Sequence, residues 1–244
     1  MSTEEKLRVI EIVREQGDGR ARVLAGAGGN STSAVVTLAR EIERLGVDGI
    51  LVVVPYYNKP TQEGLYQHFA TVADALEAPV VMYNVPGRTS VNMTGDTALR
   101  LAEHGNIVAT KEASGSLAQV MEIVRDAPPG FAILSGEDDL TLPIIALGGH
   151  GVVSVASNEA PAMMSDMVRL ALDGNLADAK VLHYNLLDLM HVNFIETSPI
   201  PVKAALAMMG LIQEEYRLPL TRISTANRER LHLELAKLHL VEMP

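Results

Sequence analysis

The sequence predicts an α/β fold built on a parallel sheet, in the form of a (β/α)8 (TIM) barrel. Short apolar runs rich in β-branched residues alternate with segments whose apolar residues recur at helical spacing. One run and the segment after it together span ~30 residues. Polar and reactive side chains gather where the apolar runs end. A barrel places its chemistry at that end of its strands, so both observations favour this architecture.

An opening helix is followed by six βα units. Ser2 and Glu5 form a capping-box pattern, which predicts that the chain begins with a helix. The strands are expected over residues 22–26, 50–54, 80–84, 107–111, 131–135 and 151–155. The segments between them carry apolar stripes typical of helices that cover a sheet, such as Leu65, Phe69, Val72 and Leu76.

The chain from residue 176 onward is predicted to be helical, and no linker rich in Pro, Gly or Ser marks a domain boundary. A closed barrel needs eight strands, whereas the sequence shows six. We therefore expect an N-terminally truncated barrel over residues 1–174 and a C-terminal helical region over residues 175–244.

A doubly wound dinucleotide-binding fold is the weaker alternative. The turn after the first strand reads Gly-Ala-Gly-Gly-Asn-Ser over residues 26–31, which lacks the third glycine of the nucleotide-binding pattern. No acidic residue ends the next strand, where that fold would bind a ribose. The barrel remains the better interpretation.

Composition excludes several classes of protein. The net charge of −10 contains no block of like charge, which disfavours nucleic-acid and anionic-membrane partners. The absence of cysteine excludes disulfides, thiolate zinc sites and a cysteine nucleophile. The sequence has no signal-peptide pattern and no apolar run near the roughly 18 residues of a membrane span, so we expect a cytoplasmic protein.

Lys111 ends an apolar strand. Burial of its amine would disfavour the ammonium form and make it a nucleophile toward carbonyls, although it could be an ordinary strand-end lysine with its head in water. Tyr57 and Tyr83 stand at the ends of the two preceding strands, so we expect two phenols and an amine at one face of the sheet. A phenol with a pKa near ~10 can relay protons beside a Schiff base, although each tyrosine alone could be a rim residue.

Other polar residues are open to two interpretations. Arg88, in a predicted loop five residues after Tyr83, could clamp a substrate carboxylate or pair with a surface acid. Gly136 would let the backbone approach a small ligand. His150 has no second ligand at metal spacing, and the acidic run 137–139 at a helix start is better suited to the helix dipole. We predict no metal ion and no cofactor.

Five motifs, in this order, resemble the dihydrodipicolinate synthase (4-hydroxy-tetrahydrodipicolinate synthase) family of the class I aldolase superfamily, which also includes N-acetylneuraminate lyase. They are Pro-Tyr-Tyr-Asn-Lys-Pro (55–60), Tyr-Asn-Val-Pro-Gly-Arg-Thr (83–89), Lys-Glu-Ala-Ser-Gly (111–115), Leu-Ser-Gly-Glu-Asp (134–138) and Gly-Gly-His-Gly-Val-Val-Ser (148–154). The resemblance runs from Met1 to the C-terminal helices.

The resemblance implies a role for each matching residue. Lys111 looks like the lysine that forms a Schiff base with pyruvate, and Tyr83 like the tyrosine that relays protons. Tyr57 looks like the tyrosine that reaches the neighbouring subunit's site, and Arg88 like the residue that holds the carboxylate of aspartate semialdehyde. Two further residues match pocket positions whose backbone borders the pyruvate adduct, namely Gly136 and Val153.

The implied activity is that of a lyase of lysine and diaminopimelate biosynthesis. Pyruvate would condense with L-aspartate 4-semialdehyde to give 4-hydroxy-tetrahydrodipicolinate, through an imine, an enamine and a final transimination with ring closure. Because Tyr57 would act across an interface, the resemblance implies a tight dimer, and the family usually forms a homotetramer as a dimer of dimers.

Two features depart from the family pattern. Family members carry a strand, a helix, a second strand and a Thr-Thr-Gly-Glu loop before the helix that begins at Ser2, so we expect this chain to be a shortened form of a longer enzyme. The lysine-feedback site is only half present: Asn30 and Tyr56 match it, but Ala34 and Lys6 replace a usual glutamate and a usual histidine. Loss of an acid and gain of a cation disfavour an ammonium ligand, so we predict weak or absent inhibition by lysine.

Two alternatives remain open. One is another pyruvate-dependent aldolase, of the sugar-acid or N-acetylneuraminate lyase type, which differs in its preferred aldehyde. The other is a non-catalytic truncated homologue, which would not form a borohydride-trapped adduct with pyruvate on Lys111.

Overall fold

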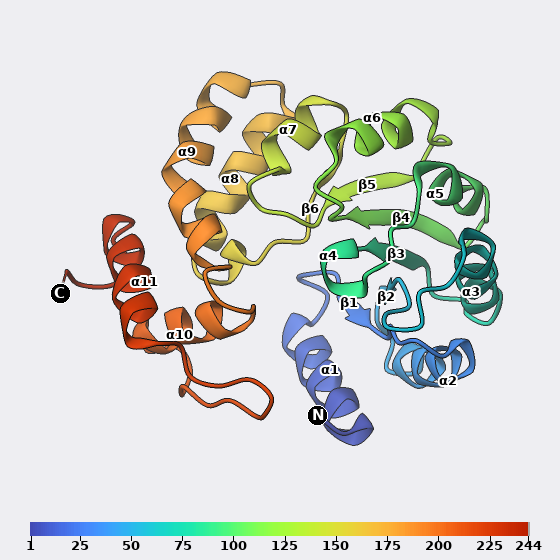
Figure 1. Ribbon diagram of the computed structural model, residues 1–244, viewed down its shortest axis with the longest axis horizontal. Coiled ribbons are helices and arrows are strands. Elements are labelled where there is room, and N and C mark those ends of the chain that lie inside the picture. Colours follow the sequence, from blue (N-terminus) through green and yellow to red (C-terminus); the bar gives the residue numbers. More distant parts are fainter. Residues whose placement is uncertain (244) are drawn as a thin grey trace. The chain divides into compact units, whose positions relative to one another are not determined.

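Five parallel strands form the sheet of the first of two compact units, Met1–Gly136, in the computed structural model, which describes residues 1–243 (Figure 1). They are β1 (Leu24–Gly26), β2 (Gly49–Val53), β3 (Val80–Asn84), β4 (Ile107–Glu112) and β5 (Ala132–Ser135). Each strand pairs in parallel with the next one along the chain. A helix connects each strand to the next, as parallel pairing requires.

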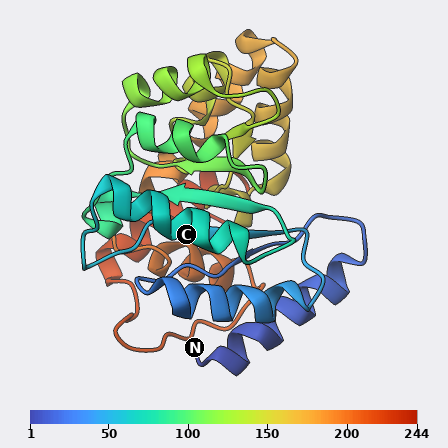
Figure 2. The same ribbon diagram turned by 90° about the vertical axis from the view of Figure 1, so that its right-hand side faces the viewer.

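The connecting helices lie side by side in one layer over the sheet (Figure 2). The layer consists of α2 (Thr32–Glu43), α3 (Gln62–Asp74), α5 (Gly95–Ala102) and α6 (Leu117–Asp126). Two more helices complete this unit, α1 (Thr3–Gly17), which opens with the predicted capping box, and the single turn α4 (Pro86–Thr89).

Burial along the strands alternates between the two faces of the sheet. Ile50, Val52 and Met82 point toward the helices and are fully buried. Residues between them, such as Leu51 and Val53, belong to the other face and are partly exposed. The helix-covered face therefore holds the core of the unit, while the opposite face can offer side chains to a ligand.

The second unit begins at Glu137 and is mostly helical. Its elements are α7 (Thr141–Ala146), β6 (Gly151–Val152), a 3-10 turn η1 (Ala156–Asn158), α8 (Pro161–Leu172), α9 (Leu176–Val192), α10 (Ile200–Met208) and α11 (Thr225–Lys237). A methionine- and leucine-rich core joins α8, α9 and α11 through residues such as Met164, Met167, Leu186, Leu189, Leu231 and Leu235.

The predicted α/β class and the six strands, those of an incomplete barrel, are confirmed, but three strands are shorter than expected, β5 by only one residue because it begins at Ala132. β1 begins at Leu24 instead of residue 22, because the Asp48 carboxylate accepts the backbone N–H of Val23 at 2.8 Å. β6 ends at Val152 instead of residue 155, because the carboxylate of Asp138 takes the backbone N–H groups of Val155 at 3.0 Å and Ala156 at 2.8 Å away from the sheet.

Two other features bear on the sequence predictions. The loop predicted around Arg88 is the single helical turn α4, which begins at Pro86 because proline suits the first position of a helix. Among residues 1–243, no helix has the length and apolar character needed to cross a membrane. The division of the chain between residues 174 and 175 remains a prediction.

The second unit contains a buried carboxyl group with few partners. Glu159 is 2% exposed, and its Oε2 accepts one hydrogen bond, from Asn193 Nδ2 at 3.3 Å. Burial raises the pKa of Glu159 to about 8; the charge of Asp138 acts in the same direction, and the hydrogen bond from Asn193 opposes both. Glu159 is therefore protonated in the folded chain at pH values where it ionises in the unfolded chain.

This shift predicts a stability that falls as pH rises. Between pH 4.5 and 8 the folded chain holds a proton on Glu159 that the unfolded chain has lost. The free energy of unfolding therefore falls as pH rises through this range. Glu159→Gln removes this cost, which amounts to roughly 5 kcal/mol by pH 9. In urea unfolding, the variant should have the same free energy of unfolding as the natural chain at pH 4.5 and a higher one at pH 9.

The exposed Glu229 provides the control, since Glu229→Gln changes the same group in solvent and should leave the pH dependence as it was. Equal unfolding free energies for Glu159→Gln and the natural chain at every pH would contradict the prediction.

Candidate active site

Tyr83 and Lys111 stand opposite each other on neighbouring strands. The register pairs Tyr83 of β3 with Lys111 of β4, and both belong to the partly exposed face of the sheet. The Nζ of Lys111 lies 4.1 Å from the centre of the Tyr83 ring, within the range of a cation–π contact. The structure thus brings together an amine and a phenol, as the sequence predicted.

Gly136, which directly follows β5, lies against the stem of Lys111. A Cβ at this position would come within 3.0 Å of Lys111 Cε and 2.8 Å of Ala113 Cβ. The backbone N–H of Gly136 donates to the carbonyl of Glu112 at 2.8 Å, which holds it in place beside β4. Only glycine at this position therefore allows the Lys111 side chain to keep its conformation.

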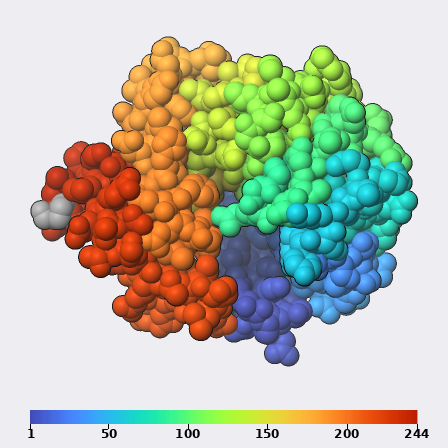
Figure 3. All heavy atoms as spheres, in the orientation of Figure 1, coloured from blue at the N-terminus to red at the C-terminus, as the bar shows by residue number. Residues whose placement is uncertain are grey.

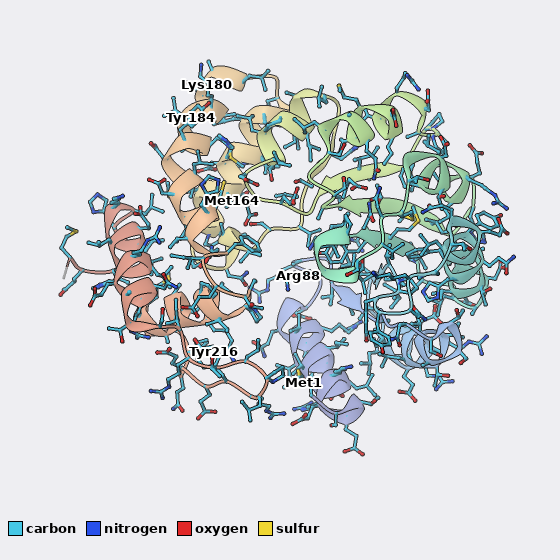
Figure 4. The ribbon with its side chains drawn as sticks, viewed as in Figure 1. Met1, Arg88, Met164, Lys180, Tyr184 and Tyr216 are labelled. Atoms are coloured by element: carbon cyan, nitrogen blue, oxygen red, sulfur yellow. The ribbon has the colours of Figure 1, made fainter. Side chains whose placement is uncertain are left out.

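Arg88 lies on α4, directly after the strand that carries Tyr83, and its side chain is exposed (Figure 4). The turn is held from within, because the buried Thr89 donates its hydroxyl to the carbonyls of Val85 at 3.2 Å and Val91 at 2.9 Å. In the space-filling view α4 reaches the surface (Figure 3). The guanidinium is thus carried by a rigid turn and remains accessible to a ligand.

Tyr57 differs from Tyr83 in that no packing within this chain covers it. Its side chain is 87% exposed, and its φ of 72° lies in the left-handed region that non-glycine residues seldom adopt. Backbone strain of this kind tends to persist where function requires it. Neighbouring Asn58 donates through Nδ2 to the carbonyl of Asn30 at 2.9 Å, and Tyr56 is 44% exposed.

Val153 directly follows β6 in the second unit and is partly buried. In the first unit, an apolar hollow of about 320 Å³ lies among Val23, Leu24, Pro79 and Val108, at the amino ends of the strands. Lys111 lies at the carboxyl end of β4, so this hollow is remote from its amine. Among residues 1–243, no group of three or more His, Asp or Glu is placed to hold a metal ion.

The sequence predictions gave no role to two polar residues of this region. Asn84 and Glu112 immediately follow Tyr83 and Lys111, and they are 0% and 1% exposed. Their positions in the sequence could have indicated a hydrogen-bonded pair, because an amide and a carboxyl at the ends of otherwise apolar strands are seldom buried without a partner.

An amine against a phenol at the carboxyl ends of adjacent parallel strands, on an incomplete (β/α)8 barrel, defines an enzyme class that forms an imine with a carbonyl substrate. The model of the Dihydrodipicolinate synthetase family matches residues 1–238. The chain belongs to this family.

Its relatives extend the match over nearly the whole chain. A 4-hydroxy-tetrahydrodipicolinate synthase of Koribacter versatilis is 52% identical over 232 residues, which are 95% of this chain and 77% of the relative. The crystal structure of dihydrodipicolinate synthase from Aquifex aeolicus superposes with a TM-score of 0.97 at 46% identity, covering 100% of this chain and 84% of the other. A chloride-inhibited Acinetobacter baumannii enzyme, solved with pyruvate, gives a TM-score of 0.97 at 41% identity and covers 99% and 83%.

The contact between Gly136 and Lys111 predicts a specific defect. In Gly136→Ala the added methyl group must displace the lysine stem, so covalent capture of pyruvate by Lys111 should slow by roughly tenfold to a hundredfold. Borohydride reduction followed by intact mass measures the rate. Gly105→Ala, where nothing lies within 4 Å of the new methyl group, should react as the natural chain does, and an equal rate in the Gly136 variant would refute the idea.

Proposed function

We propose that this chain condenses pyruvate with L-aspartate 4-semialdehyde to give 4-hydroxy-tetrahydrodipicolinate, as a lyase of lysine and diaminopimelate biosynthesis. The observation that carries the proposal is the contact of the Lys111 amine with the Tyr83 ring at 4.1 Å, at the carboxyl ends of β3 and β4. Membership of the dihydrodipicolinate synthetase family supports it, as does the Koribacter versatilis relative, which is identical at 52% of the aligned residues.

The reaction begins at the amine of Lys111. It adds to the ketone carbon of pyruvate, and loss of water leaves an imine. Removal of a methyl proton gives an enamine, whose terminal carbon attacks the aldehyde carbon of the semialdehyde. The amine of the semialdehyde then displaces Lys111, which closes the ring and frees the enzyme. Tyr83 accepts and returns the protons of these steps, and no metal or cofactor is required.

The remaining site residues position the substrates. Arg88 binds the carboxylate of the semialdehyde through its guanidinium, and the backbone at Gly136 and Val153 borders the pyruvate adduct. Tyr57 completes the site of a second copy of the chain; its 87% exposure and strained backbone support a role outside its own fold. The working form is then a homo-oligomer, a tight dimer that pairs into a tetramer, in the cytoplasm. Residues 1–174 form its barrel part and 175–244 its helical region.

Trapping with borohydride tests the nucleophile. Pyruvate and NaBH₄ should leave one carboxyethyl group on the natural chain, located on Lys111 by peptide mapping, and none on Lys111→Ala. Lys180→Arg, which changes an exposed lysine on α9, serves as the control and should react fully (Figure 4). A folded natural chain that forms no adduct would instead support the non-catalytic homologue.

Substitution of Arg88 separates the synthase from a sugar-acid aldolase. Loss of a charge-assisted contact costs about 1.5–3 kcal/mol, so Arg88→Ala should lower kcat/KM for the semialdehyde by roughly tenfold to a hundredfold. Pyruvate trapping should remain unchanged, and Arg88→Lys should be only partly active because lysine cannot bind bidentately. An undiminished kcat/KM in Arg88→Ala would point to the aldolase.

We also propose that lysine inhibits this enzyme weakly or not at all. Asn30 and Tyr56 match the lysine-feedback site, but Ala34 offers no charge to an ammonium group. Steady-state assays with added lysine should show little change in rate. An inhibition constant below a millimolar would contradict the proposal.

A further inference from the structure

A buried polar pair lies directly behind the reactive pair. The register that sets Tyr83 against Lys111 also sets Asn84 against Glu112. Successive residues of a strand point to opposite faces, so Asn84 and Glu112 project from the helix-covered face. They bind each other across the two strands, since Asn84 Nδ2 donates to Glu112 Oε1 at 3.0 Å and lies 3.3 Å from Oε2.

The Glu112 carboxyl also binds the turn and the helix that come after β4. Its Oε1 accepts the backbone N–H of Ser114 at 3.0 Å, which fixes the turn after the strand. It also accepts from Gln119 Nε2 at 3.4 Å, a side chain of α6. One carboxyl group thus holds the neighbouring strand, the turn after Lys111 and the covering helix.

Asn84 uses both ends of its amide in the same network. Its Oδ1 accepts the backbone N–H of Met93 at 3.0 Å, and its Nδ2 donates to Asn92 Oδ1 at 2.8 Å. Asn92 in turn donates to Gln119 Oε1 at 2.8 Å, which closes a ring of four side chains. Every member that is buried therefore has a partner, and the ring admits one arrangement of the strand ends.

The network lies on a face of the sheet that is otherwise mainly apolar. Apolar side chains fill the same face elsewhere, as at Val52 and Met82. Burial raises the pKa of Glu112, against the hydrogen bonds from Ser114, Asn84 and Gln119, so the carboxyl group is held there at a cost. Satisfied polar networks of this kind specify one geometry, and here that geometry sets the offset between the strands of Tyr83 and Lys111.

We propose that Glu112 and Asn84 are positioning residues, which hold the amine of Lys111 in line with the phenol of Tyr83 from the opposite face of the sheet. This inference rests on the proposed function. The predicted defect lies in the covalent steps, because Glu112 binds Asn84, Ser114 and Gln119, which lie on β3, in the turn after β4 and on α6, whereas Arg88 lies on α4.

The test compares three substitutions by the rate of pyruvate trapping and by steady-state kinetics. Glu112→Leu removes the network at similar volume and should slow trapping and lower kcat by roughly tenfold or more, with KM for the semialdehyde unchanged. Glu112→Gln can keep an oxygen toward Ser114, Asn84 and Gln119, so it should recover most of the rate. Thr110→Val is the matched control, because Thr110 lies two residues earlier on the same strand and face and is also fully buried.

Each outcome decides the question. Trapping at the natural rate by folded Glu112→Leu, or an equal loss in Thr110→Val, overturns the positioning role. If Glu112→Leu does not fold, Gln119→Leu provides the test. Gln119 is a partly exposed residue of α6, and its loss removes one donor to Glu112. This variant should slow trapping and leave KM unchanged. A natural chain that forms no adduct overturns the proposed function as well, whereas a natural chain that reacts beside unaffected variants overturns only this inference.

Discussion

The parallel register between β3 and β4 is the constraint on which the site depends. It places Tyr83 beside Lys111 on one face and Asn84 beside Glu112 on the other. A slip by one residue would bury the amine beneath the helices and turn the carboxyl group outward, because side chains alternate between faces. The same hydrogen-bonded ladder therefore fixes both the reactive groups and the network behind them.

Besides the strand register, a glycine and a fixed turn position the side chains of the site. The Lys111 side chain can adopt its conformation because Gly136, just after the next strand, has no side chain. Arg88 is carried by a turn that Pro86 opens and the buried Thr89 closes through two carbonyls. The site thus combines side chains from strand ends, which are rigid, with one cation on a short turn that remains exposed.

Much of this arrangement could be predicted from the sequence, because apolar period and strand order are local signals. The strand over 80–84 was predicted to the residue, and the adjacency of Tyr83 and Lys111 followed from strand order alone. The strand ends at Leu24 and Val152 were missed because Asp48 and Asp138 accept backbone N–H groups far from them in sequence. The roles of Asn84 and Glu112 were missed for the same reason, since their partners come from separate elements.

The two buried glutamates show why position, and not burial alone, decides what such a group does. Glu112 accepts from three donors on the strand, the turn and the helix around it, and it directly follows Lys111. Glu159 accepts from only one neighbouring side chain among the described residues, that of Asn193, so its burial is less compensated and its pKa rises to about 8. A carboxyl group surrounded by donors fixes those donors in space, whereas one with a single donor mainly makes folding depend on pH. The number and origin of the donors therefore assign geometry to Glu112 and pH sensitivity to Glu159.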